Sequence, residues 1–268
     1  MKNKFSIGIQ LFSVRDDMEA DPVKTLTALK EMGYDGVELA GTYDMSAVKI
    51  KTILDEIGLE LVSAHVGPDL LEQEEILADY AATGMKYIVI PWFPAPKDEK
   101  ELENAVAKIR GIAERCRVHG MQLLYHNHDF ELETVGGRCI LDAYYEDIPV
   151  DLLQTELDMC WVNVGGKEPA AYLRKYTGRA PVVHLKDFTG SKSANMDGLI
   201  DSEDIQTGAP TTFEFRPVGY GRQEIPELVK AAEDAGSHWL IVEQDEPAMG
   251  FSRMRCAEMS VRYLKSFL

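Results

Sequence analysis

The chain has 268 residues, of which 45% are hydrophobic and 27% charged, and its formal net charge is −17. This composition is typical of a soluble globular protein, and the length fits one barrel of roughly 250 residues or two small domains. An acidic surface repels phosphate backbones, which argues against nucleic acid as a partner. The four cysteines are scattered without Cys-x-x-Cys spacing, which favours a reducing compartment over a disulfide framework or a zinc ribbon.

The sequence contains no signal for a membrane. The apolar stretch over residues 5–12 is too short and too interrupted for a signal peptide, and no small-residue cleavage site follows it. No apolar run approaches the roughly 20 residues that span a bilayer. We therefore expect a cytoplasmic protein with no membrane partner.

Short β-type runs alternate with longer stretches of helical periodicity along the first half of the chain. Strands are predicted at residues 5–12, 36–40, 59–66 and 87–92. A helix is predicted after each of them, from the Asp21-Pro22 cap to Gly33, up to about Gly58, over 70–83 and over 98–119. This alternation is the pattern of βα units, which place their strands in a parallel sheet.

The second half repeats the pattern. Strands are predicted at 122–129, 152–159, 181–188 and 239–245, with helices near 140–146, 168–176, 226–235 and 253–267. Eight strand–helix units favour a closed barrel, and no Gly-x-Gly-x-x-Gly follows the first strand to favour a Rossmann sheet. We predict an α/β fold, a single (β/α)8 TIM barrel over residues 1–268. The long connection from Phe188 to Ile225 is expected over the barrel mouth.

Ionisable residues gather at the carboxyl ends of the predicted strands, where barrel enzymes carry out their chemistry. They are Glu38, His65, His126, His128, Glu156, Asp158, His184, Lys186, Glu243 and Asp245. Residues two apart on a strand share a face, so both members of the last four pairs would point the same way. Each one taken alone has a structural explanation, such as a hydrogen-bonded core histidine or a helix cap.

Buried together, these charges would cost several kcal/mol per unpaired ion, a cost that a bound divalent cation removes. Histidine nitrogens and carboxylate oxygens suit Mn, Co, Zn, Fe(II) or Mg without selecting one of them. We therefore expect one divalent metal ion at the strand ends.

Seven sequence pieces, in order along the chain, resemble a known family. They are GIQLFSVR, GYDGVELA, SAHVG, YHNHDFE, ELDMCW, VVHLKDF and IVEQDEP. Together they resemble the xylose isomerase-like barrel superfamily, in the sugar phosphate isomerase/epimerase branch that includes inosose dehydratases and ketose 3-epimerases. The resemblance covers essentially the whole chain.

The resemblance implies a single metal site and a set of roles. The ligands carried onto this sequence are His126, Asp158, His184 and Glu243. Ketose epimerases have Glu where this chain has His126. The implied catalytic residues are Glu243 as base and ligand combined, then Glu156, with Lys186 or His128 donating protons or binding hydroxyls. Residues expected to bind substrate are Glu38, His65, His128, Trp161 and Arg216; Trp161 has core packing as an equal alternative.

The implied activity is that of a metal-dependent isomerase or epimerase of a keto-sugar or related polyol. A base removes the proton α to a carbonyl polarised by the metal, through an enediolate. A dehydratase or lyase acting on a keto-inositol or 3-keto-sugar uses the same intermediate and stays open as the alternative. Less favoured are a non-catalytic sugar-binding subunit and an apurinic endonuclease-like enzyme. The expected partner is a small sugar or polyol. The sequence does not define the oligomeric state, and a homodimer is kept as an option because barrels of this size often dimerise.

Overall fold

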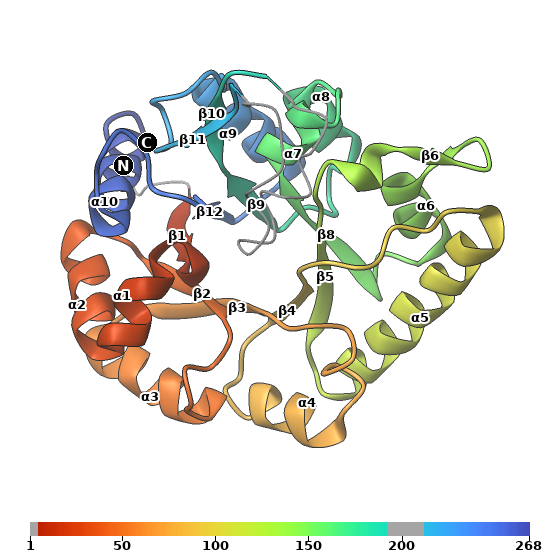
Figure 1. Cartoon of the computed structure of the whole chain (residues 1–268). Helices are drawn as coiled ribbons and strands as arrows, with labels where there is room; N and C mark the ends of the chain where they lie inside the picture. The colour runs from red at the N-terminus through yellow and green to blue at the C-terminus, as the bar shows by residue number, and fades with distance from the viewer. Residues whose placement is uncertain (1–4, 192–211) are drawn as a thin grey trace.

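The computed structural model describes residues 5–191 and 212–268 and has the predicted barrel architecture (Figure 1). Eight strands pair in parallel around a closed barrel in the order β1-β12-β9-β8-β5-β4-β3-β2. They are β1 (Ser6–Gln10), β2 (Gly36–Ala40), β3 (Glu60–His65), β4 (Tyr87–Ile90), β5 (Gln122–His126), β8 (Leu153–Asp158), β9 (Val182–Leu185) and β12 (Trp239–Val242). The prediction of a TIM barrel is confirmed.

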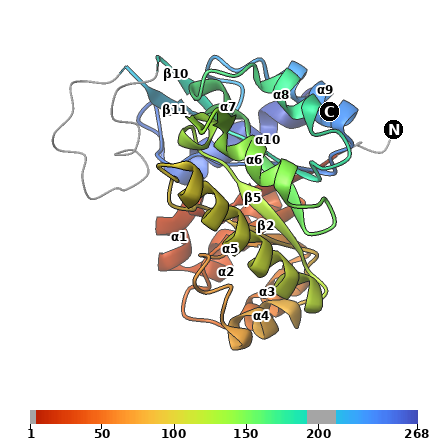
Figure 2. The same cartoon turned by 90° about the vertical axis from the view of Figure 1, so that its right-hand side faces the viewer.

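Helices lie around the outside of the strands (Figure 1), and Figure 2 shows the same arrangement from the side. They are α1 (Arg15–Ala20), α2 (Pro22–Met32), α3 (Ala47–Ile57), α4 (Glu74–Ala81), α5 (Glu99–Val118), α6 (Ile140–Asp147), α7 (Met159–Val164), α8 (Pro169–Lys175), α9 (Ile225–Ala235) and α10 (Arg253–Lys265). The predicted start and end of α2 are confirmed. Asp21 caps the helix by accepting a hydrogen bond from the Lys24 backbone N–H, and Gly33 ends it with φ 105°. In the part of the chain that the structure describes, no helix is long and apolar enough to span a membrane.

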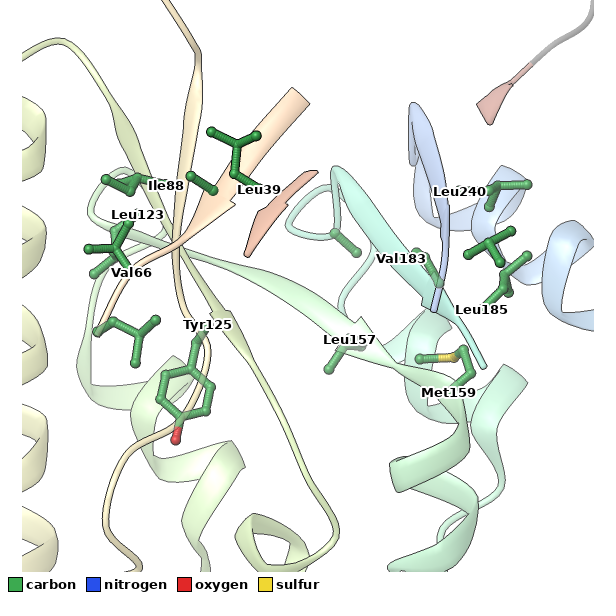
Figure 3. Packing of buried hydrophobic residues seen from close by; sticks show 14 of the residues in the cluster. Leu39, Val66, Ile88, Leu123, Tyr125, Leu157, Met159, Val183, Leu185 and Leu240 are labelled. Atoms are coloured by element: carbon green, nitrogen blue, oxygen red, sulfur yellow. The ribbon is translucent and has the colours of Figure 1, made fainter. Parts of the chain in front are cut away.

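Alternating strand residues divide the apolar core into two layers. Side chains such as Leu123, Tyr125, Leu157 and Val183 belong to the large cluster between strands and helices (Figure 3). A smaller cluster joins residues of the opposite strand face: Val62, Tyr87, Val89, Leu124, Val182, Trp239 and Ile241. It fills the barrel interior at the amino-terminal side of the strands. Because successive side chains alternate, the next inward positions along β5, β9 and β12 are polar.

Two glycines make room for the barrel interior. A Cβ on Gly36 would lie 2.9 Å from Cη2 of Trp239, and one on Gly8 would lie 2.5 Å from Cδ1 of Ile241. Small residues on β1 and β2 therefore allow the Trp239 ring to close the bottom of the barrel. The next inward residues of these strands are Gln10 and Glu38, which form part of the polar layer above the ring.

Several predicted boundaries were wrong. The helix predicted from residue 70 begins at Glu74, because backbone hydrogen bonds from Leu70 and Leu71 to Gly67 close a separate turn first. The structure also contains elements that were not predicted: η1 (Leu11–Val14), η2 (Phe130–Leu132), the short α1 and α7, and the hairpin of β6 (Thr134–Val135) and β7 (Arg138–Cys139).

The strand predicted over 181–188 is in fact two elements. β9 ends at Leu185, and β10 (Asp187–Thr189) pairs antiparallel with β11 (Glu214–Arg216). The buried carboxylate of Asp187 directs this change, since it accepts backbone hydrogen bonds from Phe188, Gly219, Gly221 and Gln223. The long connection that was expected over the mouth, from Phe188 to Ile225, contains β11 and part of β10. Its residues 192–211 lie outside the described part of the chain.

Candidate active site

A pocket of about 350 Å³ opens at the carboxyl ends of the barrel strands. Its lining includes expected site residues, namely His65, His126, His128, Lys186, Glu243 and Asp245. Of the four predicted same-face pairs, only Glu156 and Asp158 lie entirely within a strand. The other pairs lie partly or wholly beyond their strand ends, yet their members still gather at this mouth. The position of the pocket is the one that barrel chemistry uses.

Four buried side chains form a compact group of ligand type; His126 and Glu243 line the pocket, and Asp158 and His184 are fully buried beside them. One ligand atom from each of His126, Asp158, His184 and Glu243 lies within 4.8 Å of all the others. His184 Nδ1 lies 3.0 Å from Glu243 Oε2, and His126 Nε2 lies 4.0 Å from the same oxygen. These are the four residues that the resemblance implied as metal ligands.

The chemistry of this group fits a divalent ion. Asp158 Oδ1 accepts a hydrogen bond from the Trp161 backbone N–H and caps α7. Asp158 Oδ2 is buried without a hydrogen-bond partner among the described residues, and the Lys186 ammonium lies 3.5 Å from it. A buried carboxylate oxygen without a hydrogen-bond donor is costly unless a cation satisfies it. Two imidazoles and two carboxylates form a mixed nitrogen and oxygen set that suits several divalent metals.

A second group of ligand type lies beside the first. His65 and Glu156 join His126 and His184, again with ligand atoms within 4.8 Å of one another. His65 Nε2 lies 2.8 Å from Glu156 Oε2 and 3.0 Å from Glu38 Oε1. Burial and the neighbouring charge of Glu38 raise the pKa of Glu156 well above its usual range. Burial raises the pKa of Asp158 as well. The two groups therefore differ in Glu243, which lines the pocket and whose pKa is held well below its usual range by Lys186 and His184 in spite of burial. This favours the group that contains Glu243.

The Glu38 carboxylate forms a hydrogen bond with the His184 imidazole on the nitrogen that faces away from Glu243. Its Oε1 accepts from Gln10 Nε2 at 2.7 Å and lies 2.8 Å from His184 Nε2, and its Oε2 accepts from Ser63 Oγ at 2.5 Å. Burial alone would raise the pKa of Glu38, but His65 and His184 outweigh that effect and hold the pKa well below its usual range. Glu38 is fully buried and does not line the pocket. It is therefore placed to orient a ligand, whereas we expected it to contact substrate.

Lys186 places a buried ammonium among carboxylates. Its Nζ lies 3.0 Å from Glu243 Oε2, 3.0 Å from Asp245 Oδ1 and 3.5 Å from Asp158 Oδ2. Burial alone would lower the pKa of Lys186, but these charges outweigh it and raise the pKa well above its usual range. The rings of Trp161 and Phe215 lie 5.2 and 5.7 Å from Nζ and hold the charge in place.

His128 lines the pocket as a neutral imidazole. Burial and the charge of Lys186 lower the pKa of His128 to about 3. Its backbone N–H donates to Glu131 Oε2, and Glu131 Oε1 accepts from the Tyr125 hydroxyl. Burial raises the pKa of Glu131 to about 8. Glu131 was not predicted, because a glutamate three residues beyond the His-Asn-His run resembles a solvated loop residue in sequence.

Besides Glu38, two further residues expected to bind substrate do not line the pocket. Trp161 is fully buried and packs against Phe213 and Phe215. This is the core packing that was the equal alternative to substrate binding. Arg216 pairs with Glu214 at 2.7 Å on β11 and is not among the residues that line the pocket. Conversely, the lining includes residues that the sequence did not single out, namely Phe12, Arg15, Trp92 and Glu246. Phe12 and Arg15 belong to the GIQLFSVR piece, which was the available signal.

Comparison with known sequences assigns the chain to a family. A family model described as xylose isomerase-like TIM barrel matches residues 26–267, and the chain belongs to this family. The inosose dehydratase of Geobacillus kaustophilus (strain HTA426) is 26% identical over 297 aligned positions, which cover 98% of this chain and 94% of the relative.

Solved structures with the same fold support the architecture. A sugar phosphate isomerase/epimerase from Parabacteroides distasonis superposes with a TM-score of 0.79 at 20% identity, covering 99% of this chain and 95% of that one. The probable 3-DHS dehydratase AsbF from Bacillus anthracis, described as involved in petrobactin synthesis, superposes with a TM-score of 0.73 at 17% identity, covering 98% and 100%. At these identities the likeness establishes the fold.

Proposed function

We propose that the protein is a metal-dependent lyase that eliminates a leaving group β to the carbonyl of a keto-polyol or keto-sugar. The observation that carries the proposal is the group of His126, Asp158, His184 and Glu243, whose ligand atoms lie within 4.8 Å of one another and of which His126 and Glu243 line the pocket. These four residues would hold one divalent ion. A divalent ion bound there acts as a Lewis acid on a substrate carbonyl and makes the α proton more acidic.

Glu243 is the preferred base. It lines the pocket, whereas Glu156 is fully buried beneath the floor. Burial alone would raise the pKa of Glu243, but Lys186 and His184 outweigh it and keep the carboxylate ionised. Glu243 is therefore placed to accept the α proton.

Lys186 is the preferred acid, because its ammonium lines the same pocket 3.0 Å from Glu243. When the α carbon–hydrogen bond breaks, its electrons pass to the carbonyl group as an enolate. The enolate then re-forms the carbonyl, and the α–β carbon–carbon double bond forms as the β carbon–oxygen bond breaks. A proton from Lys186 converts the departing oxygen to water or an alcohol, and the proton on Glu243 restores Lys186. The products are an unsaturated ketone and the neutral leaving group, so atoms and charge balance.

Similarity to named relatives supports elimination over the isomerisation that the sequence resemblance put first. The relative from Geobacillus, which aligns with 98% of this chain, is called an inosose dehydratase. Loss of water from an inosose is an elimination next to a ketone. The neutral imidazole of His128 and the partly exposed His65 line the pocket and would bind substrate hydroxyls.

Epimerisation is the second candidate, and one observation favours it. His65 ends β3 and Lys186 follows β9, two strands that face each other across the barrel order. Both side chains line the pocket, and epimerisation at one carbon needs a proton-transfer group on each face of the substrate. The two candidates share the first step and differ in the fate of the intermediate.

Incubation of the metal-loaded protein with 2-keto-inositol and with keto-hexoses in deuterated water separates the two. We expect loss of water or of an alcohol, with the unsaturated ketone detected by its ultraviolet absorption and by NMR. Deuterium at the α carbon of an intact sugar would support the epimerase instead. If neither reaction occurs with stoichiometric metal bound, the proposal of proton abstraction is wrong.

A further inference from the structure

Glu131 is a buried glutamate that lies close to the pocket without lining it. It belongs to η2, the short helix that follows β5, and its side chain is fully buried. It is not among the residues that line the pocket. Its partner Tyr125 belongs to the apolar layer between the strands and the helices, outside the barrel interior. The Glu131 carboxyl can therefore act on the site only through the residues that it binds.

The two oxygens of Glu131 join the turn after β5 to the strand itself. Oε2 accepts a hydrogen bond from the His128 backbone N–H at 2.8 Å, and Oε1 accepts one from the Tyr125 hydroxyl at 2.8 Å. Tyr125 is held in turn by α6, because the Tyr145 hydroxyl donates to the Tyr125 carbonyl oxygen. Glu131 thus fixes the backbone of His128 relative to β5 and to the helix that packs beside it.

The position of the His128 ring depends on the same turn. A backbone hydrogen bond from Glu133 to Phe130 closes η2. The Phe130 ring stacks on the His128 imidazole, with 5.8 Å between ring centres and 5° between ring planes. The Trp161 ring lies 5.6 Å from the same imidazole. Because Glu131 and Phe130 are neighbours in η2, the hydrogen bond that holds Glu131 also places the ring that stacks on His128.

The His128 imidazole has hydrogen-bonding capacity that the protein leaves free. The residue lines the pocket, and its Nδ1 is buried without a hydrogen-bond partner among the described residues. Buried polar atoms of native proteins normally have a partner, so a substrate hydroxyl is the expected one here. Such a contact depends on a fixed ring direction, because a displacement of about 1 Å can cost about 100-fold in rate.

We infer that Glu131 is a positioning residue, which fixes the turn that directs the His128 imidazole at a substrate hydroxyl. The inference rests on the proposed function, in which His128 binds that hydroxyl. Glu131 itself touches neither the substrate nor the reacting atoms. A hydroxyl away from the reacting carbons is bound equally in the ground state and the transition state. Loss of Glu131 should therefore raise KM and leave kcat nearly unchanged.

The test is a double-mutant cycle between Glu131→Leu and His128→Ala in the metal-loaded protein, with 2-keto-inositol as substrate. Glu131→Leu should raise KM about two- to tenfold, the range of one hydrogen bond, with kcat within about twofold. In the His128→Ala background the same substitution should change KM by less than about twofold, because its effect passes through the missing imidazole. Glu131→Gln keeps an acceptor for the His128 N–H and should retain most of the wild-type KM. An equal increase in both backgrounds, or no increase in either, would overturn the inference.

Asp142→Ala is the matched control for lost stability. The Asp142 carboxyl accepts hydrogen bonds from the hydroxyls of Tyr172 and Tyr176 and does not line the pocket. Its loss should lower the free energy of unfolding without changing KM. If Glu131→Leu does not fold, Tyr125→Phe takes its place in the cycle, since it removes only the hydroxyl that holds Oε1. It should raise KM about twofold or more in the presence of His128 and leave KM unchanged in its absence.

A measurement without turnover separates the positioning role from the proposed function. In metal-free protein labelled with ¹³C at histidine Cε1, the NMR resonance of His128 reports the placement of its ring against Phe130. Glu131→Leu should shift this resonance, whereas Glu131→Gln and Asp142→Ala should leave it in place. An unshifted resonance in Glu131→Leu refutes the positioning role even if elimination proceeds. If the resonance shifts but wild type eliminates from neither 2-keto-inositol nor keto-hexoses, the proposed function fails instead.

Discussion

The ammonium of Lys186 lies 3.0 Å from Oε2 of Glu243, and both side chains are buried at the floor of the pocket. Asp158 and Asp245 lie within 3.5 Å of the same ammonium. One cation thus faces three carboxylates, two of which belong to the proposed metal site. In the absence of metal, Lys186 and His184 together stabilise the charge of Glu243, and a bound ion would neutralise the carboxylates further.

Replacement of Lys186 by Met should destabilise the metal-free protein by about 3–5 kcal/mol, because it leaves buried carboxylates without a partner. The loss should be smaller with saturating metal, since the ion neutralises the same carboxylates. Urea unfolding with and without metal measures both values. Lys175→Met is the control: Lys175 pairs with Asp142 from a half-exposed position, and its loss should cost at most about 1 kcal/mol. Equal effects of the two variants would contradict the account.

Glu38→Gln should weaken metal binding about 10- to 100-fold without removing a ligand. The carboxylate lies 2.8 Å from Nε2 of His184 and fixes which imidazole nitrogen faces the pocket. Isothermal titration with Mn²⁺ measures the change. Glu56→Gln, an exposed substitution on α3, serves as control and should leave the affinity unchanged. Wild-type affinity in Glu38→Gln would show that the carboxylate does not orient His184.

Much of this architecture follows from local patterns in the sequence. The alternation of strands and helices predicted the barrel, and polar residues such as His184 and Glu243 at strand ends predicted where side chains would converge. Glu38 was correctly placed at the end of β2, but it was expected to contact substrate and instead contacts His184. Whether a buried carboxylate faces the pocket or supports a histidine depends on partners such as Gln10 and Ser63, which are distant in sequence.

Asp187 illustrates a second kind of limit. In sequence it continues the apolar run of β9, and an Asp after a strand usually caps the next helix. Its actual partners include the backbone of Gly219 and Gly221, more than thirty residues further on. Long-range backbone contacts of this type leave no periodic signal, so neither β10 nor β11 was predicted.

Asp187→Ala should destabilise the protein by about 3 kcal/mol or more, because it leaves several buried backbone N–H groups without an acceptor. Asp98→Ala is the control, since Asp98 accepts one exposed capping bond from Glu101 and its loss should cost about 1 kcal/mol. Denaturant unfolding of both variants gives the comparison. A similar small loss in both would mean that Asp187 does not anchor the segment.

The free energy of unfolding should depend on pH because the pKa of Glu131 differs between the folded and unfolded chain. Its pKa is raised from 4.5 to about 8 by burial, so between these values the unfolded chain is ionised while the folded chain keeps the proton. The stability of wild type relative to Glu131→Gln should therefore fall as pH rises from about 4.5 to 8, by at most about 1.4 kcal/mol per pH unit. Below that window the difference should be constant. Thermal unfolding of both proteins across pH 4–9 tests this, and a difference independent of pH would contradict it.

The most direct test of the proposed centre is the metal content of purified protein after loading with Mn²⁺ and desalting. We predict one ion per chain in wild type and in Glu156→Gln, and loss of the ion in Asp158→Asn and Glu243→Gln. Both groups of ligand type contain His126 and His184, so the carboxylates distinguish them: Glu156 belongs to one group, and Asp158 and Glu243 belong to the other. Retention of the ion in Asp158→Asn with its loss in Glu156→Gln would place the metal in the other group and contradict the account.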